Sequence, residues 1–206
     1  MNNTIYCLGK NYPLHAKEMG SNLPSTPVVF IKPSTSYNIT NKISIPEISN
    51  DMHYEVELVC RISKDAENIS EKEALDFIDA FAIGIDFTLR DIQNNAKKEG
   101  NPWSISKGFF GSASVGSFID KIDIQDYNNL KISLKLNGEL KQFGYTKNMI
   151  FKIPFIVSYL SNIFTLKSGD LIFTGTPEGV GKVDIGDVLE CSIVDYVKSN
   201  LIVNVV

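Results

Sequence analysis

Short runs of alternating apolar and polar positions recur along the chain and predict a β-rich protein. In the run 54–60, Glu55 and Glu57 are expected on one face of a strand and the apolar side chains on the other, because successive side chains of a strand alternate in direction. The continuous apolar run 80–85 predicts a buried strand that ends at Asp86. The pattern therefore places three carboxylates on or beside two strands.

The rest of the pattern adds further strands and a few short helices. We expect strands at 5–8, 28–33 and 42–45, a hairpin over 130–145 that turns at Asn137-Gly138, and strands that follow the turns Gly169-Asp170 and Gly186-Asp187. Helices are expected at 14–19, at 70–77 behind a Ser70 to Glu73 capping box, at 89–98 ending at Gly100, and at 154–164. The segment 88–91 has the pattern of a cap that opens the third of these helices. The class is α+β, with β-structure in the majority.

Composition limits the classes of partner and compartment. A chain of 206 residues fits one domain, which we place at 1–206. The net charge of −4 and the scattered basic residues predict neither a nucleic-acid nor an anionic-membrane partner. Cys7, Cys60 and Cys191 lie in apolar runs, which indicates buried reduced thiols rather than a disulfide framework. Since we find neither a signal peptide nor a membrane-spanning run, we expect a reducing compartment, the cytoplasm.

The three carboxylates are candidate metal ligands. Glu55, Glu57 and Asp86 would repel one another if they met without a cation, and an all-oxygen set suits a hard divalent ion: Mg²⁺, Mn²⁺ or Ca²⁺. The alternative is that both glutamates form the solvated face of an ordinary antiparallel strand. The spacing by itself leaves both interpretations open.

Two helices carry further candidate chemistry. His15 and Glu18 are three apart on a predicted helical turn, where a carboxylate that orients an imidazole makes a general base. A surface pair on a short helix is the alternative. Arg90 and Gln93 share a face of the helix that follows Asp86, and they form either part of a site or a polar helix surface.

Two basic residues and one loop are weaker candidates for a functional site. Lys32, before Pro33, is expected to be a solvated strand-end lysine, with contact to a substrate carboxylate as the alternative. His53 is expected to be a strand-edge residue rather than a ligand. The loop 175–181 lacks the glycine spacing of a phosphate-binding loop or a dinucleotide fingerprint, although its glycines would let backbone amides approach an anion.

Four motifs in order along the chain resemble a known family. They are Tyr-Glu-x-Glu-Leu at 54–58, Ile-Asp-Phe-Thr-x-Arg-Asp-x-Gln at 85–93, Lys107, and Gly-Thr-Pro-x-Gly-Val-Gly at 175–181. Together with Gly-Lys-Asn-Tyr at 9–12, they are similar to the fumarylacetoacetate hydrolase family, in particular its short acylpyruvase and oxaloacetate decarboxylase branch. The resemblance implies a mixed β-sandwich roll, without the extra N-terminal domain of larger members, and a homodimer.

The resemblance also implies a role for each candidate residue. It makes Glu55, Glu57 and Asp86 the metal ligands, His15 and Glu18 the water-activating pair, Lys107 the stabiliser of an enolate, and Lys10, Arg90, Gln93 and Thr176 the substrate contacts. Lys10 stands where the family often has arginine, and the two differ at bidentate anion sites, so this departure bears on substrate preference.

The implied activity is metal-dependent cleavage of a carbon-carbon bond in an acylpyruvate-type 2-oxo acid, such as fumarylpyruvate or acetylpyruvate, with oxaloacetate decarboxylation as a second activity. Both reactions leave the pyruvate enolate. Isomerisation of 2-hydroxyhepta-2,4-diene-1,7-dioate and oxaloacetate tautomerisation are the alternatives among enzymes. A metal-binding protein that binds a small molecule without turnover is the alternative outside them.

Overall fold

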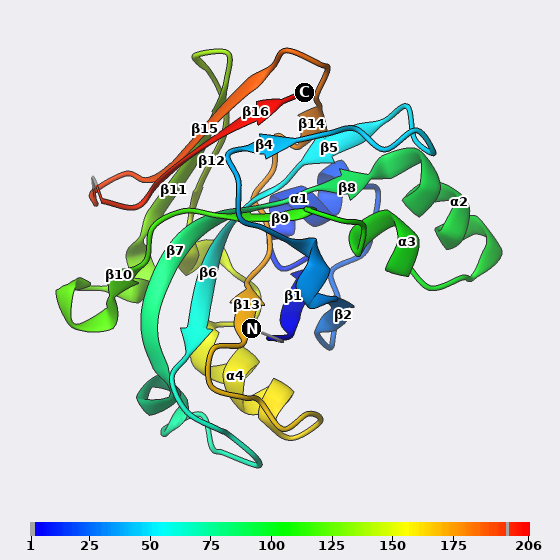
Figure 1. Ribbon diagram of the computed structural model, residues 1–206. Helices are drawn as coiled ribbons and strands as arrows, with labels where there is room; N and C mark the ends of the chain where they lie inside the picture. The colour runs from blue at the N-terminus through cyan, green and yellow to red at the C-terminus, as the bar shows by residue number, and fades with distance from the viewer. Residues whose placement is uncertain (1–2, 197) are drawn as a thin grey trace.

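The computed structural model describes residues 3–196 and 198–206, which form three β-sheets and several short helices (Figure 1). The largest sheet contains β1 (Ile5–Gly9), β2 (Val28–Lys32), β3 (Tyr37–Asn38), β6 (Val56–Ile62), β7 (Ile78–Asp86), β9 (Ala113–Val115), β10 (Ile119–Asp120) and β13 (Leu171–Phe173). The second contains β4 (Lys42–Ile43), β11 (Lys131–Leu136), β12 (Glu139–Tyr145), β15 (Val188–Ile193) and β16 (Asn200–Val205). The third contains β5 (Met52–Tyr54), β8 (Thr88–Leu89) and β14 (Gly181–Lys182).

The helices are short and lie outside the sheets. The α-helices are α1 (Pro13–Glu18), α2 (Arg90–Glu99), α3 (Ser104–Lys107) and α4 (Ile153–Ser161). Single 3₁₀ turns are η1 (Ser34–Ser36), η2 (Ala74–Phe77), η3 (Lys121–Asp123), η4 (Tyr127–Asn129) and η5 (Thr146–Asn148). None of the helices in the described chain has the length and apolar character needed to cross a membrane.

The two larger sheets pack face to face around the main hydrophobic core. In the largest sheet the strand order is β2-β1-β13-β6-β7-β9-β3, and in the second it is β12-β11-β15-β16-β4. The long curved strands β6 and β7 lie against β11, β15 and β16 (Figure 1). The main hydrophobic cluster takes side chains from both sheets, among them Leu58, Ile83, Ile132 and Val203. The mixed β-sandwich with its curled sheets confirms the expected fold class.

The alternation along β6 and β7 separates this core from the face that carries polar groups. Leu58 lies in the main cluster, whereas its neighbour Val59 belongs to a second, smaller cluster on the opposite face. Glu57 and Asp86 share that opposite face by the same alternation. Gly84, opposite Glu57 in the pairing of β6 with β7, keeps this face closely packed, because a Cβ there would lie 2.7 Å from Val59 Cγ2.

Local sequence signals located several elements correctly. The hairpin turn has φ values of 51° at Asn137 and 82° at Gly138, as a two-residue turn between twisted strands requires. Helix α2 ends at Gly100 in the left-handed conformation, with φ 72°. The predicted capping box is only half formed: Glu73 accepts from the Ser70 amide at 3.1 Å, but the Ser70 hydroxyl donates to Glu73 instead of capping, and a 3₁₀ turn at Ala74–Phe77 replaces the expected helix. The three cysteines are buried and free, as expected.

Two local predictions were wrong. The segment 88–91 does not cap α2, because Thr88 and Leu89 form β8 and no side chain caps the helix. Asp91 instead accepts from the Ser49 hydroxyl at 2.6 Å and from the Asn50 amide at 3.0 Å. The strand expected at 42–45 is also shorter, since only its first two residues pair with β16.

Candidate metal centre and active site

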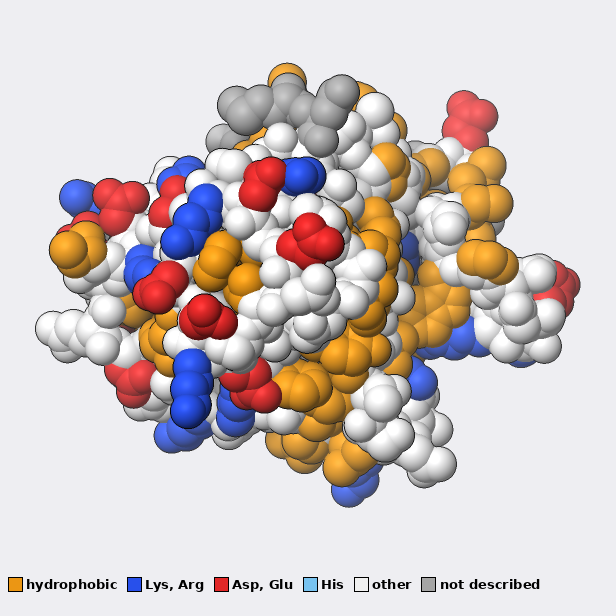
Figure 2. All heavy atoms as spheres, turned by 90° about the horizontal axis from the view of Figure 1, so that it is seen from below, with side chains coloured by type: hydrophobic (Ala, Val, Ile, Leu, Met, Phe, Trp, Pro, Cys, Tyr) orange, Lys and Arg blue, Asp and Glu red, His pale blue; other side chains and the backbone are white. Residues whose placement is uncertain are grey.

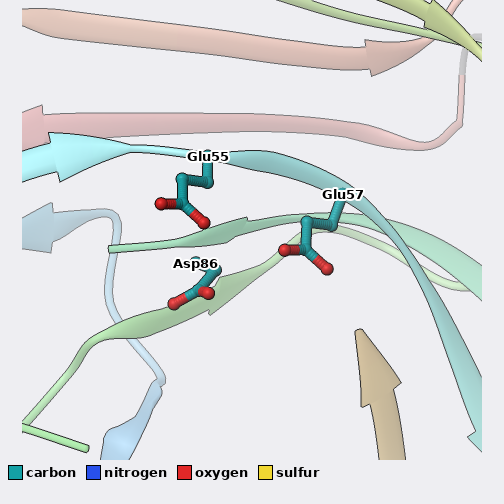
Figure 3. A group of neighbouring side chains, drawn as sticks. All are labelled: Glu55, Glu57 and Asp86. Atoms are coloured by element: carbon teal, nitrogen blue, oxygen red, sulfur yellow. The ribbon is translucent and has the colours of Figure 1, made fainter. Parts of the chain in front are cut away.

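Three buried carboxylates meet where β6 begins and β7 ends. Glu55 lies in the break between β5 and β6, Glu57 lies within β6, and Asp86 is the last residue of β7. They are at most 5% exposed, and one oxygen of each lies within 4.8 Å of the others (Figure 3). The structure therefore brings the three predicted ligands together, and a solvated strand face is excluded because both glutamates are buried.

A glycine amide on a distant loop positions one of these carboxylates. The Gly175 amide donates to Glu57 Oε2 at 2.6 Å across 118 positions of sequence. Gly175 has a φ of 98°, and a Cβ there would lie only 2.6 Å from the Cβ of Asn11. Any other residue would both strain the backbone and clash, so this position requires glycine.

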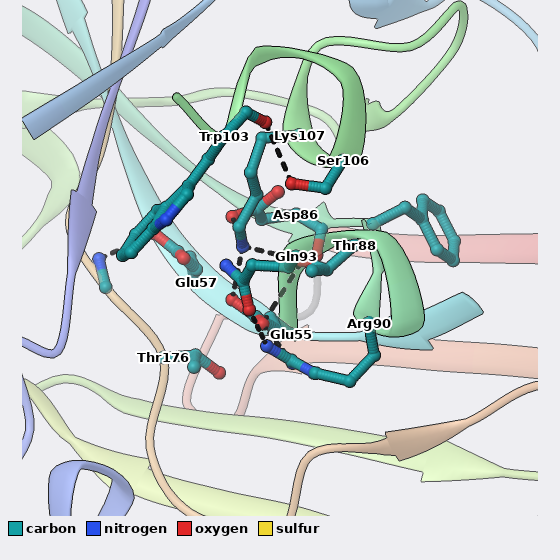
Figure 4. A network of polar contacts seen from close by, with 12 residues as sticks. Glu55, Glu57, Asp86, Thr88, Arg90, Gln93, Trp103, Ser106, Lys107 and Thr176 are labelled. Atoms are coloured by element: carbon teal, nitrogen blue, oxygen red, sulfur yellow. Dashed lines mark hydrogen bonds and ion pairs between the residues drawn. The ribbon is translucent and has the colours of Figure 1, made fainter. Parts of the chain in front are cut away.

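Lys107 connects two of the carboxylates from the end of α3. Its Nζ donates to Asp86 Oδ2 at 2.6 Å, to Glu55 Oε2 at 2.9 Å and to Thr88 Oγ1 at 2.6 Å (Figure 4). The Thr88 hydroxyl donates in turn to Glu55 Oε1 at 3.1 Å. The ammonium group thus lies beside the oxygen cluster.

The first turns of α2 supply a second cation to the cluster. Arg90 pairs with Glu55, and its Nη1 donates to the Gln93 side-chain oxygen at 2.6 Å (Figure 4). Both residues are buried, which excludes a plain polar helix surface. The predicted shared face of Arg90 and Gln93 is confirmed by this contact.

The charges in the cluster divide it into a paired and an unpaired part. Burial alone would raise the pKa of Glu55, but Lys107 and Arg90 outweigh it and hold the pKa well below its usual range. Burial, Asp86 and Glu55 together raise the pKa of Glu57 well above its usual range. Burial opposes the charged form of Lys107, yet Asp86 and Glu55 prevail and raise its pKa. Between the two glutamates, the surroundings therefore disfavour the charged form of Glu57, and a bound cation would stabilise that form.

The residues present fit a divalent ion. Asp86 Oδ1 is buried and, within the described residues, receives no hydrogen bond, although Lys32 Nζ lies 2.8 Å away. Asp86, Glu55 and Glu57, the last with a poorly compensated charge, form a compact all-oxygen set, as Mg²⁺, Mn²⁺ and Ca²⁺ prefer.

Helix α1 brings the histidine and its carboxylate to the same pocket. His15 Nδ1 lies 3.1 Å from Glu18 Oε2, and the other oxygen of Glu18 accepts from the Gly179 amide at 3.0 Å. His15 is 5% exposed, whereas Glu18 is exposed, so the pair joins a buried imidazole to a carboxylate at the surface. The contact predicted from the i, i+3 spacing is therefore present.

One narrow pocket beside the carboxylates is lined by most of the remaining candidate residues. Its lining includes Lys10, His15, Glu55, Arg90, Gln93, Lys97, Trp103, Lys107 and Thr176. All ten residues predicted from the sequence therefore lie in this pocket, in the carboxylate cluster or in direct contact with one of them.

The expectations for two basic residues were wrong. Lys32 is fully buried rather than solvated, because it pairs with Asp86 and donates to the Ser112 hydroxyl at 2.9 Å. His53 is not at a strand edge, since β5 is the central strand of the third sheet. Its Nε2 lies 2.9 Å from Asp51, and burial together with Arg90 lowers its pKa.

Sequence reasoning missed two residues that support the site. Thr88 joins Lys107 to Glu55; the sequence placed it in the motif at 85–93 and in the predicted cap, but neither gave it a role in the site. Gln142 donates to Thr176 Oγ1 at 2.9 Å and accepts from the Val56 amide at 2.9 Å. The signal for Gln142 was a polar residue at an inward position of the predicted hairpin.

Comparison with known proteins identifies the family. The family described as fumarylacetoacetate (FAA) hydrolase C-terminal matches residues 4–204. A Bos taurus protein named oxaloacetate tautomerase FAHD1, mitochondrial, is 45% identical over 190 residues, which cover 92% of this chain and 86% of that protein. An oxaloacetate decarboxylase, mitochondrial, from Dictyostelium discoideum is 44% identical over 191 residues, covering 92% and 88%.

A solved structure agrees with these relatives. The fumarylpyruvate hydrolase from Pseudomonas aeruginosa, in complex with Mn²⁺ and pyruvate, superposes with a TM-score of 0.94 at 36% identity and covers 100% of this chain and 90% of its own. The cluster of three carboxylates supports a divalent-metal site in this chain as well. The chain therefore belongs to the fumarylacetoacetate hydrolase family, and it is an enzyme, a hydrolase or a related lyase or isomerase.

Proposed function

We propose that the chain is a divalent-metal-dependent enzyme that forms the enolate of a bound 2-oxo acid, and that oxaloacetate is its substrate. The observation that carries this proposal is one pocket that holds a base, His15 with Glu18, and a cation, Lys107, beside three buried carboxylates. The base suits removal of a proton from C3 of the acid, and the cation suits the negative charge that then develops. The names of the relatives that match 92% of the chain support oxaloacetate.

Each residue has a role that follows from its contacts. Because His15 Nδ1 faces Glu18, Nε2 is the ring nitrogen that takes up the proton, and Glu18 stabilises the imidazolium that results. Arg90, Gln93 and Thr176 offer donors to the substrate carboxylate from the pocket wall. Return of the proton to the enolate oxygen completes a tautomerisation, and loss of CO₂ from the same acid gives pyruvate enolate.

The proposed ligands of the metal are Glu55, Glu57 and Asp86, and the proposed ion is Mg²⁺, with Mn²⁺ as the nearest substitute. A divalent ion held there would polarise the 2-oxo group and offset the charge of the enolate. Removal of the metal by a chelator is expected to abolish turnover, and added Mg²⁺ or Mn²⁺ is expected to restore it. Full activity in the chelated protein would contradict this assignment.

The two histidines allow a matched test of the base. We expect His15→Ala to slow enzymatic keto-enol exchange of oxaloacetate by ~10²–10⁴-fold, the usual contribution of a general base. His53→Ala is the control, because His53 lies in the third sheet and does not line the pocket. Exchange can be followed by ultraviolet absorbance and corrected for the uncatalysed rate. Equal effects of the two substitutions would exclude His15 as the base.

Hydrolysis of acylpyruvates is the second candidate. The superposition on a fumarylpyruvate hydrolase favours it, and the same His15 and Glu18 would then activate water. Decarboxylation needs no attacking water, so His15→Ala is expected to reduce hydrolysis of acetylpyruvate far more than decarboxylation of oxaloacetate. An equal loss of both activities would mean that the pair shapes the pocket rather than activating water.

We also propose that the chain acts as a homodimer built from one domain per subunit. Hydrophobic side chains gather in a broad band on one face of the molecule (Figure 2). An apolar groove of about 480 Å³ lies among Ile5, Tyr37, Ile39, Phe118 and Leu171. Burial of such a surface between two copies would remove it from water. Light scattering during gel filtration tests this, and a monomeric mass at micromolar concentration would refute it.

A further inference from the structure

We propose that Lys97, with Lys10 beside it, forms a second anion subsite at the mouth of the pocket and selects 2-oxo acids that carry a second carboxylate at their far end. This inference rests on the proposed function, because it concerns the binding of that substrate. Lys97 is not among the site residues predicted from the sequence.

The position of Lys97 in α2 directs it to the pocket. It lies seven residues after Arg90 and four after Gln93, which places all three on one face of the helix. All three line the pocket. Four residues of helix rise about 6 Å. A short acid whose 2-oxo end meets Gln93 would therefore extend toward Lys97.

An aromatic ring supports the lysine at this position. Lys97 Nζ lies 5.2 Å from the centroid of the Trp103 ring, which also lines the pocket. Trp103 packs in turn against Phe30, with 6.1 Å between ring centroids. A cation over an aromatic face is held in place without being neutralised, so it stays available to an anion.

The charge of Lys97 has no partner in the described part of the chain. The three buried cations, Lys32, Arg90 and Lys107, each pair with a carboxylate of the cluster. Among the residues that the structure describes, no carboxylate oxygen lies within 4.0 Å of Lys97 Nζ or of Lys10 Nζ. The two lysines are therefore surplus positive charge at the pocket mouth, and the substrate is the anion that can balance it.

The surroundings of Lys97 make that charge costly when no anion is bound. Much of the side chain is exposed, but partial burial of its ammonium and the nearby Arg90 and Lys10 lower its pKa to about 8. Lys107 acts in the same direction, and only Glu55 opposes them. Lys10 is itself held in the left-handed backbone conformation, with φ 59°, which is rare for a lysine. Binding of a carboxylate relieves the repulsion between these cations.

The test compares two ligands that share the 2-oxo acid end. Oxaloacetate carries a second carboxylate, whereas pyruvate, used as a competitive inhibitor in the same assay, does not. We expect Lys97→Met to raise KM for oxaloacetate about two- to fivefold at low salt, as for a partly exposed charge pair, and to leave kcat and the inhibition constant of pyruvate unchanged. Lys97→Arg should keep KM near the wild-type value.

Lys98 supplies the matched control, because it is exposed in the same helical turn but does not line the pocket. Lys98→Met is expected to change neither constant. A parallel rise of the oxaloacetate KM and the pyruvate inhibition constant in Lys97→Met would overturn the inference and leave the proposed function intact. An unchanged KM would overturn it as well. Failure of the wild-type protein to act on oxaloacetate would instead refute the proposed function.

Discussion

Replacement of Lys32 by methionine tests how much the buried charge network contributes to stability. Lys32 and Asp86 are both 0% exposed, and Lys32 Nζ lies 2.8 Å from Asp86 Oδ1. The ammonium also donates to the Ser112 hydroxyl at 2.9 Å and to the Phe87 carbonyl at 3.3 Å. Methionine keeps much of the apolar stem of lysine, so the substitution removes the charge and its hydrogen bonds without opening a large cavity.

The expected cost follows from the burial of the pair. Removal of one partner from a buried ion pair destabilises a protein by about 3–5 kcal/mol, because the other charge stays buried without compensation. Lys107 still neutralises the other oxygen of Asp86 at 2.6 Å, so we expect the lower end, about 3 kcal/mol. For a domain of this size that free energy corresponds to a fall of roughly 6–12 °C in Tm.

The same substitution at Lys167 is the control. Lys167 pairs with Asp65 at 2.8 Å, the distance found for the buried pair, but both side chains are 60% exposed. Water and salt screen such a pair, so Lys167→Met should leave Tm almost unchanged. Scanning calorimetry of both variants in chelator-containing buffer measures the difference. Equal shifts in the two variants would refute the argument that burial, rather than distance, sets the contribution of Lys32.

Three further outcomes follow from the site. Glu57→Gln should weaken Mg²⁺ binding by on the order of 10²-fold or more, measured by calorimetry. Loss of a residue that only hydrogen-bonds to a metal ligand already lowers metal affinity by about 10–100-fold, and loss of a ligand should lower it at least as much. An unchanged affinity would exclude Glu57 as a ligand. Lys107→Met should lower kcat by roughly 10²–10³-fold through loss of enolate stabilisation, and a kcat within a few-fold of wild type would exclude that role. Because Lys97 has a pKa of about 8 and binds anions only when protonated, KM for oxaloacetate should rise between pH 7 and 9 in the wild type but not in Lys97→Arg; identical profiles would contradict the subsite.

Local rules account for the parts of the site that the sequence predicted. The two-residue period of a strand placed Glu55 and Glu57 together, and the end of an apolar run located Asp86. The i, i+3 spacing gave the contact between His15 and Glu18. Each of these needs only the geometry of one element, and the family resemblance then supplied the order in which the elements meet.

The burial of Lys32 could not be predicted from local sequence rules. A lysine before a proline at a strand end has the pattern of a solvated residue, and nothing nearby in the sequence marks it as buried. Its burial depends on Asp86 and Ser112, which lie 54 and 80 positions away and reach it only when β2, β7 and the segment after α3 come together. The wrong cap prediction at 88–91 has the same cause, since Asp91 accepts from the hydroxyl of Ser49, which lies 42 positions away in the sequence.

By itself the sequence determined the longer strands, the hairpin turn at Asn137-Gly138, the end of α2 at Gly100 and the contact of His15 with Glu18 within one helix, because backbone sterics and side-chain period act over a few residues. Only the tertiary structure decided which charged side chains are buried and which carboxylate has a poorly compensated charge. It also decided that Lys97 lines the pocket. These properties depend on removal of water and on charges brought together from distant segments. Both arise only when the sheets close around the site.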